Sequence, residues 1–279
     1  MNVRKVNYKD SDCPREFSIS LRETGFSVLH NHPIDTSLIE TVYAEWAKFF
    51  HSDIKNNYLF TEKSQDGYFP FRTENAKGTS LKDLKEFFHV YEWGRFPLEL
   101  SNATLELQSQ LIELTSTLLE WIQDETPDEV TELFSMPLPK MIEKSTTNLL
   151  RIIHYPPLDG NEEKGAIRGA AHEDINLITL LVSGTQPGLQ VQDVNGVWHD
   201  VSCDPGSIAV NTGDMLQMAS EGYYPSTTHQ IINPGGNIKN ESRYSMPLFL
   251  HPWDEVQLSK QYTARQYLDE RLKEIGLKN

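Results

Sequence analysis

The chain has 279 residues, of which 38% are hydrophobic and 23% are charged, so it can form a substantial core, and intrinsic disorder is excluded. Its 25 lysine and arginine residues and 40 aspartate and glutamate residues give a net charge of -15, which disfavours nucleic acids and anionic membrane surfaces as partners. The longest apolar run, residues 177–182, is too short to cross a membrane, and two cysteines cannot build a disulfide framework, so a cytoplasmic location is predicted.

The first half of the chain is predicted to be mainly helical. A short strand is expected over residues 26–34, and Ser37 and Glu40 form a capping-box pattern that predicts the start of a helix. One face of this helix carries apolar residues at helical spacing: Leu38, Ile39, Val42, Trp46, Phe49 and Phe50. We expect this face to be buried in the core.

The segment 58–96 is polar and rich in aromatic residues, and its poor periodicity predicts loops, apart from a short helix over 81–88. A long helix is predicted over 101–123, because apolar residues again recur on one face. The acidic stretch 124–127, which ends in proline, is expected to end that helix.

From residue 148 to residue 250 the pattern changes to short β runs bounded by turn residues. The expected strands are 148–155, 166–171, 177–182, 188–192, 197–201, 207–211, 214–218, 227–232 and 244–250. Asn195 and Gly196 predict a tight hairpin turn between two of them. This many short strands at regular spacing is typical of an antiparallel sandwich or barrel, and a helix is expected to follow over 253–275.

The predicted fold class is therefore mainly β with α: a double-stranded β-helix (jelly roll) core flanked by N-terminal and C-terminal helices. We expect a mainly helical region over 1–147 packed on the core, the jelly roll over 148–251, and the C-terminal helix over 252–279. The sequence contains neither an internal repeat nor a Ser/Gly/Pro linker between the helical and β portions, so one compact unit is expected.

Two residues of the β region have the spacing of metal ligands. His172 and Asp174 are separated by one residue, and side chains at positions i and i+2 of a strand point to the same face, so both can converge on one ion. Glu173 would then point away. A third ligand must come from a distant strand, and His229 at the start of a late strand is the candidate. Two histidines and one carboxylate form the facial triad of non-haem Fe(II) oxygenases.

Two alternatives to an iron site must be weighed. Zinc hydrolases also use two histidines and a carboxylate, but their pattern is His-Glu-x-x-His on a helix, and this alternative fails because Asn176 occupies the position of the second histidine. His172 and His229 could also be ordinary core histidines, because the H-x-D spacing alone is a weak signal.

A basic and a hydroxyl residue follow on the next β run. Arg243 and Ser245 alternate onto one face, where a guanidinium and a hydroxyl make a good socket for a carboxylate. An R-x-S pattern is common by itself, but it becomes specific when it follows an H-x-D pair and a distal histidine.

Together these motifs closely resemble the isopenicillin-N-synthase-like branch of the Fe(II)/2-oxoglutarate-dependent dioxygenases. The segments that carry the resemblance are 151–157, 172–174, 188–191, 206–214, 228–229 and 243–247. The likeness extends weakly to residues 25–34 and to the C-terminal helix.

The resemblance implies roles for six residues. It implies three iron ligands: His172, Asp174 and His229. It implies that Arg243 and Ser245 hold the distal carboxylate of 2-oxoglutarate, and that Tyr155 stands where many relatives use a tyrosine for the same carboxylate. The cofactors implied are Fe(II), 2-oxoglutarate and O2, with ascorbate as a reductant.

One departure from the family pattern concerns the co-substrate. Relatives often have asparagine two residues before the tyrosine, where this chain has Ile153, so one polar contact to 2-oxoglutarate is expected to be missing. In addition, two members of the branch, the cyclising synthase and the aminocyclopropane oxidase, keep the R-x-S residues without consuming 2-oxoglutarate.

The predicted function is an Fe(II)- and 2-oxoglutarate-dependent oxygenase that hydroxylates, desaturates or cyclises a small organic substrate, with release of succinate and CO2. One alternative is an iron-dependent oxidase of the same fold that uses Arg243 and Ser245 for a substrate carboxylate. Another is a non-catalytic jelly-roll binding protein. The expected partner is a small molecule, with no nucleic acid or membrane, and no oligomeric state is predicted.

Overall fold

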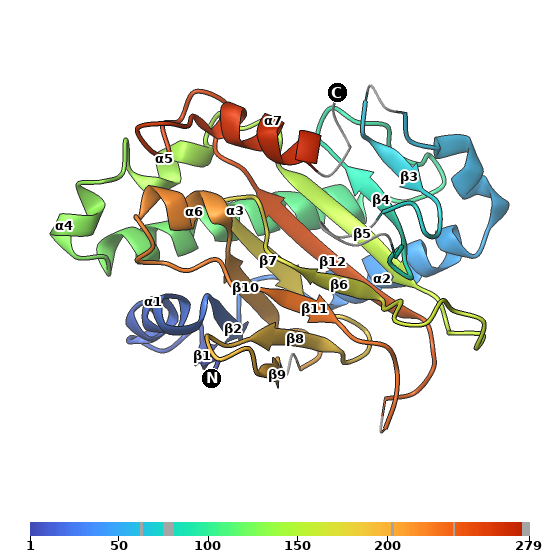
Figure 1. The fold of residues 1–279 in the computed structure, drawn as a ribbon. Coiled ribbons are helices and arrows are strands. Elements are labelled where there is room, and N and C mark those ends of the chain that lie inside the picture. The colour runs from blue at the N-terminus through green and yellow to red at the C-terminus, as the bar shows by residue number, and fades with distance from the viewer. Residues whose placement is uncertain (62–63, 75–80, 202–203, 237, 275–279) are drawn as a thin grey trace.

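The structure is a computed structural model that describes residues 1–61, 64–74, 81–201, 204–236 and 238–274. The described residues form two β sheets that face each other (Figure 1). The large sheet contains, in spatial order, β1 (Lys5–Asn7), β2 (Phe26–His30), β10 (Ile208–Thr212), β7 (Ile178–Val182), β12 (Arg243–Leu250), β5 (Leu149–Tyr155), β4 (Glu86–Val90) and β3 (Gly67–Phe69). The small sheet contains β6 (Gly169–His172), β11 (His229–Ile231), β8 (Leu189–Gln192) and β9 (Trp198–Asp200). The predicted mainly β jelly-roll core is confirmed.

Helices cover the outer face of the large sheet. In chain order the described helices are α1 (Cys13–Thr24), α2 (Thr36–Phe50), the short 3-10 helix η1 (Asp53–Tyr58), α3 (Ala103–Asp124), α4 (Asp128–Thr131), α5 (Leu138–Ile142), α6 (Asp214–Ala219) and α7 (Ala264–Glu274). In Figure 1 the small sheet lies in front of the large sheet, and α2 and α3 lie behind it. Among the described helices, none has the length and apolar character needed to cross a membrane.

Side chains alternate along the strands of the large sheet, so its two faces build two separate cores. The outer core lies between the sheet and the helices. Trp46 of α2 is fully buried in it, packs in a tilted arrangement against Phe88 of β4 at a centroid distance of 5.0 Å, and donates a hydrogen bond to Thr104 Oγ1 of α3 at 2.9 Å. The apolar face predicted for α2 is thus part of the outer core.

The inner core lies between the two sheets. Its buried residues are Phe26, Val28, Phe69, Phe87, Ile153, Tyr155, Leu189, Val191, Val201, Ala209 and Ile231. The rings of Phe60, Phe69 and Phe87 stack one on another, with successive centroids 4.1 Å and 4.6 Å apart. These residues give apolar walls to the space between the sheets.

Two of the predicted elements are wrong, and the segment 58–96, expected to form loops outside 81–88, also contains the strand β3. The helix expected over 81–88 is replaced by β4, in which Phe87 belongs to the inner core and Phe88 to the outer core. Pairing with β3 and β5 outweighs the local helical spacing. The strand expected over 214–218 is the helix α6, whose buried residues follow helical spacing: Met215, Leu216 and Ala219.

Some element boundaries also differ from the predicted ones. Asp35, and not Ser37, caps α2, because the Asp35 carboxylate accepts a hydrogen bond from the Ser37 backbone N–H at 2.9 Å. The helix expected from residue 253 begins only at Ala264, after a turn closed by the bridge between Gln257 and Thr263. Its expected end at residue 275 lies outside the described residues.

Gly25, at the junction of α1 and β2, generates the first testable prediction. It has a left-handed backbone with φ 70°, and its N–H donates to Leu21 O at 2.8 Å. A Cβ at this position would collide with Thr227 and lie 2.7 Å from Pro225 O. Left-handed backbone costs an L residue about 1–2 kcal/mol. We therefore expect Gly25→Ala to lower the free energy of unfolding by more than this, measured by urea denaturation.

Gly160→Ala is the matched control for this prediction. Gly160 also has positive φ, 86°, but no atom lies within 4 Å of a Cβ built on it. Its loss should be limited to the conformational cost, so equal losses in the two variants would contradict a steric role for Gly25.

Candidate metal centre and anion pocket

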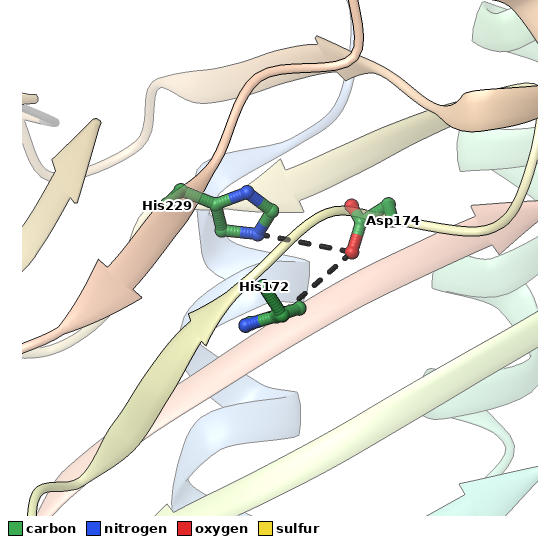
Figure 2. A group of neighbouring side chains, drawn as sticks. All are labelled: His172, Asp174 and His229. Atoms are coloured by element: carbon green, nitrogen blue, oxygen red, sulfur yellow. Dashed lines mark ion pairs between the residues drawn. The ribbon is translucent and has the colours of Figure 1, made fainter. Parts of the chain in front are cut away.

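Three side chains, two from neighbouring positions and one from a distant strand, meet at one edge of the small sheet. His172 is the last residue of β6 and His229 is the first residue of β11, and the antiparallel register puts them directly opposite each other, with ring centroids 4.4 Å apart. Asp174 approaches from the loop after β6, with Oδ1 3.8 Å from Nε2 of His172 and 3.7 Å from Nε2 of His229 (Figure 2). The ligand atoms of all three lie within 4.8 Å of one another. The structure thus brings together the three residues selected from the sequence.

Asp174 reaches the cluster by a different route from the expected one. The expectation that strand alternation aligns it with His172 is wrong, because β6 ends at His172 and Asp174 lies in the following loop. A hydrogen bond from Asp214 N to Asp174 O, 2.8 Å long, holds this loop to the start of α6. Glu173 is exposed and accepts a hydrogen bond from Thr228 Oγ1 at 2.9 Å, so it lies outside the cluster.

Backbone carbonyls orient both imidazole rings. Nδ1 of His172 lies 2.8 Å from Ala170 O, and Nδ1 of His229 lies 3.1 Å from Thr227 O. A carbonyl oxygen can only accept, so each Nδ1 carries the hydrogen and donates it. The lone pair of each Nε2 is then free to bind a metal ion, which is the usual way in which a neighbouring group selects the ligating tautomer.

The two oxygens of the Asp174 carboxylate have different surroundings. Oδ2 accepts hydrogen bonds from Thr179 Oγ1 at 2.6 Å and from Asn211 Nδ2 at 2.7 Å, whereas Oδ1 faces the two imidazoles. Burial by itself would raise the pKa of Asp174, but the two imidazoles and these two hydrogen bonds together hold that pKa below its ordinary value. The group is therefore an ionised carboxylate with one oxygen directed at the cluster.

Thr179 and Asn211 are the supporting residues that the sequence reasoning missed. Both are buried on strands of the large sheet, Thr179 on β7 and Asn211 on β10. The available signal was a polar side chain inside an otherwise apolar β run. Asn176, the fifth position of the hydrolase pattern, donates a hydrogen bond from its side-chain amide to Ile178 O at 2.8 Å. Its side chain therefore stabilises the loop.

The donor set of the cluster fits Fe(II). Two imidazole nitrogens and one carboxylate oxygen on one side of an ion leave its other coordination positions for a co-substrate and O2. The side chain of His172 is 40% exposed, whereas those of Asp174 and His229 are 4% and 10% exposed. The accessible side of the cluster is therefore beside His172.

A second polar group, the candidate anion pocket of Arg243, Ser245 and Tyr155, lies on the inner face of the large sheet. Arg243 is buried and directly paired with Tyr155, and its guanidinium carbon lies 5.1 Å from the centre of the Tyr155 ring. Its Nε donates to Gln186 O at 3.0 Å, while its Nη1 is buried with no hydrogen-bond partner in the described part of the chain. Ser245 is buried two residues further along β12, opposite the apolar Ile153.

Gly184 makes room for this guanidinium. A Cβ at position 184 would lie 2.7 Å from Nη2 of Arg243 and 3.0 Å from its Cζ. The arginine therefore lies against a residue without a side chain, and its unpaired donor is available to an anion.

The comparisons with known proteins agree with this chemistry. A model of the 2OG-Fe(II) oxygenase superfamily matches residues 146–252, and a model of the N-terminal region of the non-haem dioxygenases of morphine synthesis matches residues 8–110. A 2-oxoglutarate-dependent dioxygenase of Monascus ruber is 30% identical over 88% of this chain and 84% of its own length.

Solved structures of similar fold extend over nearly the whole chain. A structure described as an oxygenase from Shewanella oneidensis is 52% identical, with a TM-score of 0.89 and coverage of 99% of both chains. A 2OG-Fe(II) oxygenase family protein of Caulobacter crescentus is 27% identical, with a TM-score of 0.82 and coverage of 98% of this chain and 99% of its own. Because these family models and relatives together cover nearly all of its length, the chain belongs to the isopenicillin-N-synthase-like branch of the Fe(II)- and 2-oxoglutarate-dependent oxygenases.

Proposed function

We propose that His172, Asp174 and His229 bind the Fe(II) ion of this oxygenase. The observation that carries the proposal is the convergence of three free ligand atoms, each left available by hydrogen bonds to the other atom of its group. Bound Fe(II) supplies, with 2-oxoglutarate and O2, the oxidising chemistry that protein side chains lack. The enzyme oxidises a small organic substrate with release of succinate and CO2, and the protein's part is to hold and orient the reactants.

We propose that Arg243, Ser245 and Tyr155 receive the distal carboxylate of 2-oxoglutarate. The unpaired Nη1 of Arg243 supports this role, because a buried guanidinium donor needs an acceptor, and a carboxylate provides the strongest one. The Tyr155 ring lies against the guanidinium and holds it in place. The alternatives of an oxidase that spares 2-oxoglutarate and of a non-catalytic binding protein are not favoured, since similar proteins are 2-oxoglutarate-dependent dioxygenases.

We also propose that the protein acts in the cytoplasm, on small molecules and not on nucleic acid, as one compact unit. The free, buried thiol of Cys13 suits a reducing compartment, and the net charge of -15 repels phosphate backbones. Residues 1–147 contribute β1 to β4 to the sheet that also holds β5 and β12. On α7, Tyr267 donates a hydrogen bond to Asp214 Oδ2 at 2.7 Å, and this contact ties the C-terminal helix to the same unit.

Loss of one ligand should remove the metal. We expect His229→Ala to weaken Fe(II) binding by more than about 100-fold, because even a residue that only supports a ligand contributes about 10- to 100-fold. The measurement is iron content after anaerobic dialysis, with circular dichroism to check the fold. His199→Ala is the control, since His199 lies on β9 and pairs with Asp193 instead. A His229→Ala protein that keeps its iron would refute the assignment.

Loss of a hydrogen bond that supports Asp174 should weaken Fe(II) binding without removing a ligand. Thr179→Val keeps the shape of the side chain and deletes the hydrogen bond to Asp174 Oδ2. We expect the dissociation constant for Fe(II) to rise about 10- to 100-fold. Thr115→Val, which deletes a buried hydroxyl bonded to Leu111 O within α3, should leave it unchanged. Equal constants in the two variants would contradict the supporting role.

Loss of the Arg243 charge should weaken 2-oxoglutarate binding and leave Fe(II) binding unchanged. Truncating one partner of a buried charge pair costs about 2–5 kcal/mol, so Arg243→Gln should raise the 2-oxoglutarate dissociation constant by about 30-fold to several thousand-fold. The constant is read anaerobically from the visible band that 2-oxoglutarate produces on the Fe(II) protein. Gly184→Ala should also raise it, by displacing the guanidinium, whereas Gly235→Ala, in open space, should not. Unchanged 2-oxoglutarate binding in Arg243→Gln would contradict this role.

A further inference from the structure

A second buried arginine lies beside the anion pocket. Arg168 immediately precedes β6, and its side chain has no exposure to solvent. Its backbone N–H donates to Asn233 Oδ1 at 3.0 Å, which anchors the base of the side chain. At the other end, Nη2 donates to Glu241 O at 2.7 Å and to Pro156 O at 3.4 Å. Hydrogen bonds therefore fix both the backbone and the guanidinium of Arg168.

The two carbonyls place Arg168 next to Arg243. Glu241 precedes Arg243 by two residues, and Pro156 follows Tyr155, which is the residue paired with Arg243 across the sheet. Burial and the positive charge of Arg243 together lower the pKa of Arg168 to about 10. The guanidinium still carries its proton at neutral pH, so two positive charges are buried side by side.

Both guanidiniums have N–H donors without hydrogen-bond partners among the described residues. Nε and Nη1 of Arg168 and Nη1 of Arg243 are buried and lack hydrogen-bond partners among the described residues. Glu241 offers Arg168 only its backbone carbonyl, because its carboxylate lies 3.3 Å from Gln186 Nε2 and 3.8 Å from Lys239 Nζ. Buried like charges with unmatched donors are costly unless an anion accompanies them.

We propose that Arg168 is a second binding residue for the distal carboxylate of 2-oxoglutarate, acting together with Arg243. The inference rests on the proposed role of Arg243 and adds a residue that the R-x-S pattern does not contain. A carboxylate has two oxygens with about four acceptor positions, enough for the three free guanidinium nitrogens and the Ser245 hydroxyl. Its negative charge also offsets the repulsion between the two arginines. The pocket therefore selects a 2-oxo acid that ends in a second carboxylate.

A pair of ligands isolates this contact. 2-Oxoglutarate and 2-oxopentanoate share the 2-oxo acid group that binds the metal and the same carbon chain length, but 2-oxopentanoate ends in a methyl group. Dissociation constants for both are measured anaerobically on the Fe(II)-loaded protein from the visible band, without turnover. The proteins are wild type, Arg168→Gln, Arg168→Lys and Arg243→Gln, with Arg95→Gln as a control, because the Arg95 guanidinium is already paired with Asp66.

Arg168→Gln should weaken the binding of 2-oxoglutarate about 10- to 100-fold, the range for a hydrogen bond to a charged group, and leave the binding of 2-oxopentanoate unchanged. Arg168→Lys keeps the positive charge without the planar guanidinium, so its loss of 2-oxoglutarate affinity should be smaller. If the Arg168→Gln protein does not fold, Arg168→Lys serves as the test. Arg95→Gln should bind both ligands like wild type.

Two results would overturn the role of Arg168. One is unchanged affinity for 2-oxoglutarate in both Arg168 variants together with reduced affinity in Arg243→Gln. This result would leave the proposed function intact. The other is an equal loss for 2-oxoglutarate and 2-oxopentanoate, which would assign Arg168 to the general structure of the site. If Arg243→Gln also binds 2-oxoglutarate like wild type, the proposed co-substrate pocket itself fails.

Discussion

The register between β6 and β11 is the constraint on which the cluster of His172, Asp174 and His229 depends. It pairs His172 with His229, and on its other side β11 pairs His229 with Val191 of β8. A slip of one residue would turn every side chain of β11 to the opposite face. Val191 and Ile231 are buried in the inner core, so hydrophobic packing orients β11. The register with β6 shifts between His229 and Ile231, so the facing position of the two histidines depends on this irregularity as well as on the burial of their apolar neighbours.

The space between the sheets combines apolar walls with two polar groups of opposite character. The candidate metal centre contains a carboxylate, whereas the proposed anion pocket and its neighbour Arg168 carry positive charge without a matching acid among the described residues. A ligand with a chelating end and an anionic end complements both groups. The apolar walls lower the local dielectric, and this strengthens each of those contacts.

Much of this architecture could be predicted from the sequence, because its signals are local. The β runs of the second half alternate and are bounded by turns. The H-x-D, distal histidine and R-x-S motifs select residues that lie on the two facing sheets and, for Asp174, in the loop that follows β6. The errors arise where a long-range contact decides. Residues 81–88 have helical spacing, but pairing with β5 makes a strand of 86–90. Asn211 lies 37 residues from Asp174, and although it is a polar residue in an apolar β run, the sequence does not indicate which carboxylate its amide supports.

The support of Asp174 has a consequence for how the two layers are joined. Both histidines belong to the small sheet, whereas the Asp174 carboxylate is bonded to Thr179 and Asn211 of the large sheet. An ion coordinated by all three residues is therefore a cross-link between the layers. Its binding free energy adds to the stability of the folded sandwich, and the separation of the sheets becomes coupled to the occupancy of the centre.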